Sequence, residues 1–464
     1  MVVLHPSALG HLPSAIPVYR SALARMLGDH AATLEQARTA FATAREDQPL
    51  ERGAAGGLLA LAYWSNGDLD EAHAAWAGAI ADLERAGHRA DMLGGLLAMG
   101  DIRVAQGRLA DARRTFERGV RLGMEGPAAL GASGAGGAPL RGTADMLVGL
   151  AEVALEVGDL ATARRHLDES AALGEGLGLP QHPWRRRVAL AELAAAEGDA
   201  DAALAHLDEA ERVHDGDFFP ELRPIGSVRA RRWARGGRVA EAWAWVAERR
   251  ITADDPATCL AEHPLVTLAE VLVADGRPDE ATRLLDRLLT AAAAGGRGRS
   301  QVEILVVQSI AHAAAGDART ATAALEAALA LAEAEGQVRV FTERAPAVTP
   351  LLAAAARRTT ATSATSATAR RMLALVTDRS SVVAAAPARP ATATAPLIEP
   401  LSERELEVLR LLASDLDGPA MAAHLYISLN TFRTHTKNVF AKLGVTSRRA
   451  AVTRGTELGL VARR

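Results

Sequence analysis

The chain has few of the residues that mark a disulfide-rich fold or a redox site. Among its 464 residues there is one cysteine, Cys259, which excludes an internal disulfide and a multi-cysteine metal site. Aromatic residues make up only 3% of the chain, whereas hydrophobic residues make up 49% and are mostly alanine and leucine. Close-packed helices accept such small and aliphatic side chains, so the composition favours an all-α protein with a large core.

Long uncharged apolar runs are also missing. No segment approaches about 18 consecutive apolar residues, the length that a membrane-spanning helix needs. Residues 1–20 lack both a basic start and an uninterrupted apolar core, so they do not resemble a secretory signal. We therefore expect a cytoplasmic protein that neither enters nor crosses a membrane.

Lysine is almost absent. Lys437 and Lys442 are the two lysines among 52 basic side chains, and both lie near the C-terminus. The net charge is −4 for the whole chain, but residues 401–464 carry +4, which leaves −8 on residues 1–400. A basic end on an acidic body predicts that only this end contacts a polyanion.

The motifs of common catalytic sites are absent as well. The sequence has no HExxH, GxSxG or CxxC pattern, and neither lysine follows a glycine as a phosphate-binding loop requires. The segment GEGLGLP (174–180) lacks the third glycine of a dinucleotide-binding fingerprint. We predict no enzymatic activity, no metal site and no bound cofactor.

What the chain does contain is an internal repeat. The pattern Gly-(Asp/Arg)-x-x-x-Ala begins at Gly67, Gly107, Gly158, Gly198, Gly237, Gly276 and Gly316. Five of the six steps are 39 or 40 residues, and the longer one contains a Gly/Ala-rich insertion at 126–142. Each glycine separates two helix-like segments, where it supplies the left-handed conformation that ends a helix, and a following Asp caps the next one. We expect a helical hairpin at each glycine.

Stacked hairpins predict an α-solenoid, because one hairpin cannot bury its apolar face alone. The units resemble degenerate tetratricopeptide repeats with a period longer than the usual length of about 34 residues. Three tryptophans of the fifth repeat, Trp233, Trp243 and Trp245, either line a ligand site or pack in the core, which is the commoner role of tryptophan at helical spacing.

Composition divides the chain into three parts. We expect the helical-repeat domain over residues 1–345 and a partly helical Ala/Thr/Pro-rich linker over 346–396. Within the linker, TTATSATSATA interrupts the helical pattern. A small third domain should occupy residues 397–464.

The third domain has the pattern of four helices. Ser402 and Glu405 predict a capping box ahead of an apolar stripe at Leu406, Leu409 and Leu412. Residues 417–425 predict a short second helix, residues 430–443 a third helix and residues 447–459 a fourth.

A helical wheel divides the third helix into two sides. Phe432, Val439 and Leu443 share one side and should face the domain core. The exposed side carries Asn430, Arg433, Thr434 and Lys437. Cations and small hydrogen-bonding groups of this kind suit the major groove of DNA, where Arg pairs with guanine and Thr contacts a thymine methyl group.

These segments resemble the C-terminal helix-turn-helix domain of the LuxR family of bacterial transcription regulators. The resemblance spans residues 401–461 and is carried by SERELEVL (402–409), LYIS (425–428), NTFRTH (430–435), KLGV (442–445) and Ser447-Arg448. Phe432 stands where the family commonly has Val. The resemblance implies base contacts by Arg433, Thr434 and Lys437, DNA-backbone contacts by Asn430, Thr431, Asn438 and Lys442, and dimerisation through Ala451, Val452 and Leu458.

The resemblance also implies partners. A LuxR-type regulator binds double-stranded operator DNA, here expected as a homodimer, and works with RNA polymerase. The repeats resemble the sensor of the large maltose-regulator-type (MalT-type) activators, which implies a small-molecule or protein effector at the repeats. The ATPase domain with which those activators begin has no counterpart in this sequence. Two other interpretations stay open: an interaction adaptor built on the repeats, or the C-terminal portion of a longer ATP-dependent regulator.

Overall fold

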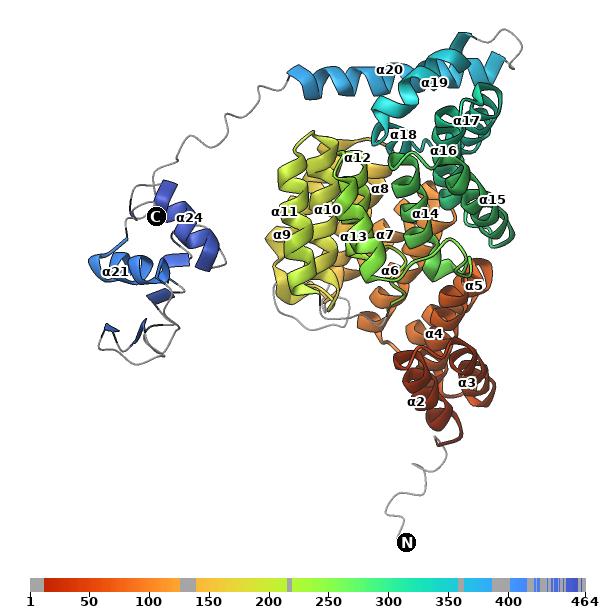
Figure 1. Ribbon diagram of the computed structural model, residues 1–464. Helices are drawn as coiled ribbons and strands as arrows, with labels where there is room; N and C mark the ends of the chain where they lie inside the picture. The colour runs from red at the N-terminus through yellow and green to blue at the C-terminus, as the bar shows by residue number, and fades with distance from the viewer. Residues whose placement is uncertain are drawn as a thin grey trace. The chain divides into compact units, whose positions relative to one another are not determined.

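The computed structural model describes two compact units, which divide between Val383 and Ala384. The described residues are 12–125, 139–214, 219–357, 363–385, 401–414, 421–422, 424–425, 432, 435–436, 438–440, 442, 445, 448–457 and 460. All regular elements within them are helices, so the all-α fold class is confirmed (Figure 1). No helix in this described part is long and apolar enough to cross a membrane.

The first unit, called the repeat unit below, is a series of helix pairs that follow one another along the chain (Figure 1). The seven repeat glycines join α4 Pro49–Asn66 to α5 Leu69–Arg85, α6 Arg89–Ala105 to α7 Leu109–Met124, α8 Thr143–Glu156 to α9 Leu160–Leu173, α10 His182–Ala196 to α11 Ala200–Val213, α12 Ile225–Arg235 to α13 Val239–Glu248, α14 Cys259–Ala274 to α15 Pro278–Ala294, and α16 Gly298–Ala314 to α17 Ala318–Glu333.

The turn of each pair has the predicted backbone geometry. All seven repeat glycines have a positive φ, between 78° and 92°, which residues with a side chain rarely adopt. Asp159, Asp199 and Asp317 each accept a hydrogen bond from the backbone N–H three residues on, at 2.9 to 3.0 Å. Asp68 makes no such bond, so it is the exception to the predicted caps.

An eighth pair precedes the predicted ones. Helices α2 Leu12–Met26 and α3 His30–Thr43 meet at Gly28, whose φ is 74°, and Asp29 accepts a hydrogen bond from Ala32 N at 2.9 Å. The repeat pattern missed this pair because Thr33 occupies the position of the alanine, where it is buried.

The repeat unit continues past residue 345. Helix α18 Arg339–Thr342 is followed by α19 Ala345–Arg357 and α20 Ser363–Ala385. Leu352 of α19 and Met372 of α20 share one buried cluster with Phe341 of α18. The first part of the expected linker is therefore packed helix, because alanine and threonine side chains are small enough for close helix contacts.

The series of pairs closes on itself. Helix α4 contacts α14, α6 contacts α16, and α8 contacts α18. Two bonds illustrate the closure: Val338 N donates to Glu156 O at 2.9 Å, and Ala110 N donates to Glu335 Oε2 at 3.1 Å. At the α6–α16 contact, a Cβ on Gly298 would lie 2.5 Å from the Gln106 carbonyl oxygen. The first helices of the pairs thus enclose a common interior.

Candidate functional site

The C-terminal unit begins with the predicted capping box at α21 Glu403–Leu412. Glu405 N donates to Ser402 Oγ at 3.3 Å, and Ser402 N donates to Glu405 Oε2 at 2.8 Å. Behind the cap, Val408, Leu409 and Leu412 are buried in the core of the unit. The cap therefore sets where the first helix starts and which face it turns to the core.

The described part of the third helix has the core side that the wheel predicted. Phe432 is 4% exposed and Val439 is fully buried, and both pack in the same cluster as Leu409. Asn438, beside Val439, is exposed. Leu443, also expected in the core, lies outside the described residues.

Lys442 connects the third helix to the capping box. Its Nζ lies 3.0 Å from Glu405 Oε2, the carboxylate that also caps α21. The backbone N–H of Ser402 holds the pKa of Glu405 below its ordinary value, and Lys442 adds to this effect. Lys442 therefore stabilises the start of α21, and its contact with the DNA backbone stays a prediction.

The other residues implied by the LuxR resemblance fall into two groups. Six lie outside the described residues: Asn430, Thr431, Arg433, Thr434, Lys437 and Leu458. Ala451, in α24 Arg448–Glu457, is fully buried in the core of the unit, and Val452 packs partly against that core. Both residues hold the fourth helix in place, while their dimerisation role stays a prediction.

One structural residue of this unit was missed as such. Arg448 Nε donates to the carbonyl oxygen of Leu412 at 2.8 Å, and its Nη2 donates to that of Ser414. Arg448 thereby caps the C-terminal end of α21 and fixes the fourth helix against it. A basic residue near a helix C-terminus is favourable, but nothing in the local pattern links two helices so far apart in the chain.

The repeat unit contains a pocket of about 200 Å³ in its closed interior. Its walls come from the first helices of six pairs, from α18 and from residues 219–223 ahead of α12. They include Trp64, Val104, Gln181, Trp184, Arg185, Val188, Phe219, Arg223, Arg299 and Arg339. The edge of the Phe219 ring meets Trp64, with centroids 6.2 Å apart.

The tryptophans of the fifth repeat do not belong to this pocket. Trp245 is 6% exposed within a hydrophobic cluster, and Trp233 and Trp243 pack against the same cluster. Guanidinium groups cover both of these partly buried rings: Arg229 lies 5.1 Å from the Trp233 ring and Arg277 lies 5.4 Å from the Trp243 ring. Core packing is therefore their role, and Trp64 and Trp184 are the pocket tryptophans.

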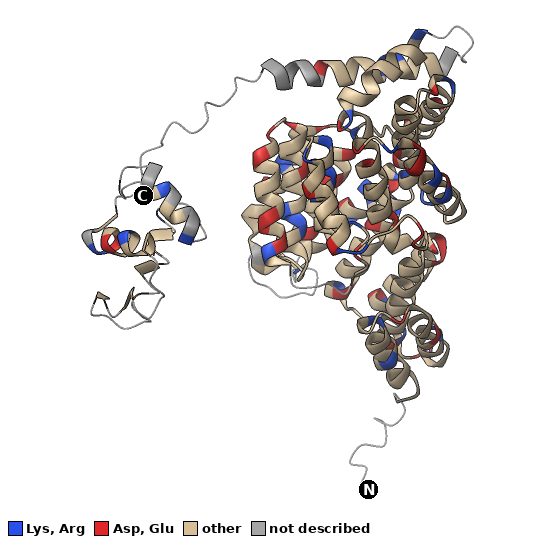
Figure 2. Cartoon of the chain, viewed as in Figure 1, with Lys and Arg blue, Asp and Glu red and all other residues tan. Residues whose placement is uncertain are grey.

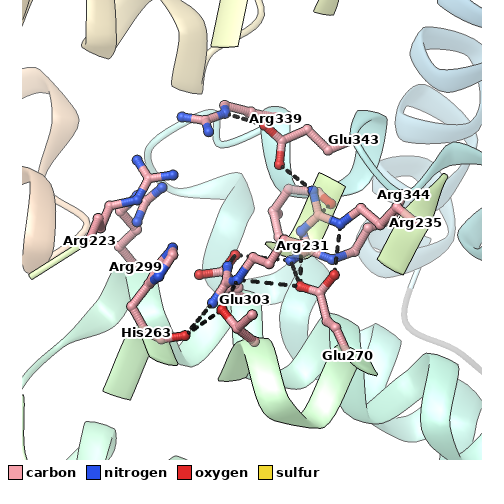
Figure 3. A network of polar contacts seen from close by, with 12 residues as sticks. Arg223, Arg231, Arg235, His263, Glu270, Arg299, Glu303, Arg339, Glu343 and Arg344 are labelled. Atoms are coloured by element: carbon pink, nitrogen blue, oxygen red, sulfur yellow. Dashed lines mark hydrogen bonds and ion pairs between the residues drawn. The ribbon is translucent and has the colours of Figure 1, made fainter. Parts of the chain in front are cut away.

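A network of buried ion pairs lies beside the pocket (Figure 3). Among the described residues it joins seven arginines and five glutamates: Arg223, Arg231, Arg232, Arg235, Arg299, Arg339, Arg344, Glu156, Glu192, Glu270, Glu303 and Glu343. Arg339 is a central member, since it pairs with Glu192 at 2.5 Å, Glu343 at 2.5 Å and Glu156 at 3.1 Å. The network joins α8 and α10 to α12, α14, α16 and α18.

Two members of the network, Glu270 and Arg223, differ in how burial and neighbouring charges shift their pKa values. Burial alone would raise the pKa of Glu270, but Arg235 and Arg344 lower it to about 2. Arg223 shows the opposite balance, because burial and then the neighbouring Arg299 and Arg339 lower its pKa to about 10. The neighbouring arginines thus fully compensate the buried charge of Glu270, whereas the charge of Arg223 is not compensated in this way.

Arg185 forms a separate cluster on the other wall of the pocket. Its guanidinium group binds Asp101 through two bonds of 2.6 and 2.8 Å and Glu152 through two bonds of 2.5 and 3.1 Å. Paired bonds of this kind fix the orientation of the planar guanidinium group.

Several of these charged residues recur at one fixed position of the repeat. A charged residue stands six positions before the repeat glycine in five consecutive repeats: Asp101, Glu152, Glu192, Arg231 and Glu270. Each lies in the first helix of its pair, and Figure 2 shows acidic and basic positions on these helices. Charges at a fixed position in successive first helices indicate a shared polar interior.

Comparison with known proteins agrees with this two-part organisation. The family model described as "MalT-like TPR region" matches residues 14–358, about three quarters of the chain. The chain belongs to this family. The model described as "Bacterial regulatory proteins, luxR family" matches residues 399–454. Residues 399–454 of the MalT-like chain thus match a LuxR-type helix-turn-helix domain.

Two curated relatives match a short part of the chain. Two strains of Mycobacterium tuberculosis, CDC 1551 / Oshkosh and H37Rv, each have a "Probable transcriptional regulatory protein NarL" that is 47% identical over 58 residues. The match covers 12% of the MalT-like chain and 27% of the NarL chains. The chain therefore spans about a quarter of the length of these relatives.

Two solved structures resemble the repeat unit weakly. A Rap protein complexed with competence and sporulation factor is 11% identical, covers 82% of this chain and 89% of its own, and has a TM-score of 0.37. The TPR domain of P58(IPK) is 16% identical, covers 79% of this chain and 98% of its own, and has a TM-score of 0.22.

Proposed function

We propose that this protein is a sequence-specific DNA-binding transcriptional regulator that reads operator DNA with its third C-terminal helix. The observation that carries the proposal is the seating of that helix: Phe432 and Val439 are buried, while Asn438 beside them is exposed. A helix anchored on one side presents the other to a major groove, and the helical wheel predicts Arg433 and Lys437 on that other side. The luxR family match over residues 399–454 supports the same function.

The test is selection of bound fragments from genomic DNA with the purified full chain. We expect a small set of enriched fragments with a common element, and an inverted repeat in that element would support binding as a homodimer. Enrichment that follows DNA length without any common element would refute sequence-specific binding.

Two substitutions separate base reading from backbone contact. Arg433→Ala should relax the preference at one base position, with a loss of about 1–3 kcal/mol on the selected element. Lys442→Ala should weaken binding to all sequences alike and reduce the salt slope by about one. Arg410→Ala is the matched control, because Arg410 is an exposed cation of the same unit that belongs to α21 and not to the third helix.

The repeat unit is proposed to sense an effector and the regulator is proposed to act with RNA polymerase. The closed interior with its pocket and buried charges supports the sensing role. Transcription reconstituted from a promoter that carries the selected element tests both parts, since the chain should change the transcript level and an effector should change it further.

A further inference from the structure

The pocket of the repeat unit lies where the two ends of the closed series meet. Trp64 of α4 and Trp184 of α10 line it from the early pairs, and Arg299 of α16 and Arg339 of α18 line it from the late ones. Glu156 joins the two sides, because it pairs with Arg299 at 2.7 Å and with Arg339 at 3.1 Å. A ligand in this pocket would therefore touch both ends of the series at once.

The ion-pair network beside the pocket has more cations than anions. Its seven arginines and five glutamates leave an excess of two positive charges. Buried charges in proteins are normally paired, because an uncompensated charge is costly away from water. An excess of this kind favours an anion in the adjoining space.

Arg223 is the weakest-paired member of the network. Its ion pair with Glu192 spans 3.5 Å, whereas Glu192 lies 2.5 Å from both Arg232 and Arg339. The Nε atom of Arg223 is buried without a hydrogen-bond partner, yet a third of the side chain is exposed, and the residue lines the pocket. Figure 3 shows its guanidinium group beside that of Arg299, and this neighbour contributes to its lowered pKa.

The other acidic residues that line the pocket are neutralised only in part, because Asp101 and Glu152 share one arginine and the neighbour of Glu221 is a histidine that is charged only when protonated. Asp101 and Glu152 bind Arg185, Glu262 binds Arg297 at 2.8 Å, and Glu221 lies 3.8 Å from His214. The weakly paired Arg223, together with the neighbouring Arg299, therefore forms the basic part of a lining that also has acidic side chains.

The remaining walls suit an apolar body with hydrogen-bond acceptors. Val104, Val188 and Phe219 supply apolar surface, together with the rings of Trp64 and Trp184. The indole N–H groups of both tryptophans and the amide nitrogen of Gln181 are buried without hydrogen-bond partners within the described residues. These unpaired groups are all donors, so the wall matches a ligand that carries acceptors.

We propose that this pocket binds a small organic acid, with its oxyanion between Arg223 and Arg299 and its apolar body against Trp184 and Phe219. The volume of about 200 Å³ suits a body of one ring, since an engineered apolar cavity of about 150 Å³ holds benzene. Carboxylate and phosphate share the oxyanion chemistry that guanidinium groups recognise. The inference rests on the proposed sensing function, for which it names the chemical class of the effector.

The test uses the full chain and three probes of similar shape: benzoate, phenyl phosphate and the neutral benzamide. Binding is followed by isothermal titration and by tryptophan fluorescence, because Trp64 and Trp184 line the pocket. We expect benzoate or phenyl phosphate to bind at least about tenfold more tightly than benzamide, and the tighter of the two identifies the acid group. Equal binding of all three probes, or no binding of either acid, would overturn the proposal.

Substitutions place the acid in the pocket. Arg223→Met should weaken binding of the better acid by about tenfold or more, and Arg223→Lys should restore part of it. Arg277→Met is the matched control, because Arg277 is an exposed cation outside the pocket. Its guanidinium group lies over the ring of Trp243, so this control includes the loss of a cation near a tryptophan. Thermal unfolding of each variant shows whether it is folded, and unchanged binding by folded Arg223→Met would overturn the assignment.

The outcome is independent of the DNA experiment. Acid binding is measured without DNA, so a failed DNA selection would refute the regulator while leaving the pocket result in force. Conversely, a chain that selects an operator but binds no acid would keep the proposed function and lose this inference.

Discussion

Asp145 makes stability depend on pH in a direction that is unusual for a carboxylate. It is fully buried in α8, where its Oδ2 accepts a hydrogen bond from Leu179 N at 2.8 Å. Its Oδ1 is buried without a hydrogen-bond partner among the described residues. Burial raises the pKa of Asp145 from 3.8 to about 7. The folded state therefore holds a proton that the unfolded chain releases, and stability should fall as pH rises between these two values.

The size of the effect follows from the two pKa values. At pH 8 the raised pKa of Asp145 costs about 4 kcal/mol of unfolding free energy, and at pH 5 it costs about 1.5 kcal/mol. Asp145→Asn removes the titration while its amide oxygen can still accept from Leu179 N. The variant should therefore gain about 2.5 kcal/mol more, relative to the unchanged chain, at pH 8 than at pH 5.

Urea unfolding followed by far-ultraviolet circular dichroism at both pH values measures this difference. Other titrating groups are common to both proteins and cancel. Asp317→Asn is the matched control: Asp317 is an exposed helix cap whose pKa is lowered by the Thr320 hydroxyl, so its titration is complete below pH 5. An Asp145→Asn difference that is the same at pH 5 and pH 8 would refute the raised pKa.

Three further predictions concern packing, capping and thiol reactivity. Gly100→Ala should destabilise the repeat unit by about 1–3 kcal/mol, because a Cβ at this position would overlap the ring of Phe116. The control is Gly94→Ala in the same helix, where a Cβ meets no atom within 4 Å and should stabilise the unit by about 0.5–1 kcal/mol. Equal effects of the two substitutions in urea unfolding would contradict this prediction. Ser402→Ala should cost the C-terminal unit about 1 kcal/mol, measured by hydrogen exchange in α21, and unchanged exchange would show that the cap contributes nothing. Cys259 is 5% exposed, and burial raises the pKa of its thiol to about 11. Iodoacetamide at pH 8 should therefore alkylate the folded chain far more slowly than the urea-unfolded chain, as followed by mass spectrometry. Equal alkylation rates would contradict the burial of Cys259.

The hairpins and the C-terminal capping box were predictable because their causes are local. Gly67 and its six counterparts need a positive φ wherever they end a helix, and Ser402 and Glu405 bond each other across three residues. Such interactions span four residues or fewer, so they can be predicted from the local sequence. The buried side of the third helix was predictable for the same reason, since Phe432 and Val439 share a helical face.

The eighth hairpin and the helices that follow residue 345 were not predictable from such local patterns. Thr33 breaks the repeat signature while still filling the buried position, and Ala/Thr-rich α20 resembles a linker in composition. In both places small side chains satisfy the packing without the residue type that the pattern requires.

The amino-acid sequence by itself determined the helical hairpins, their number to within one, the LuxR-type end and the presence of charges inside the first helices. Only the tertiary structure decided which of those charges meet. Glu156 and Arg299 are 143 positions apart, and they pair because a small rotation from each helix pair to the next adds up until α8 reaches α18 and α6 reaches α16. The total rotation depends on every packing angle along the series. The pocket and its cluster of cations therefore form only when the series closes, and local sequence patterns do not predict them.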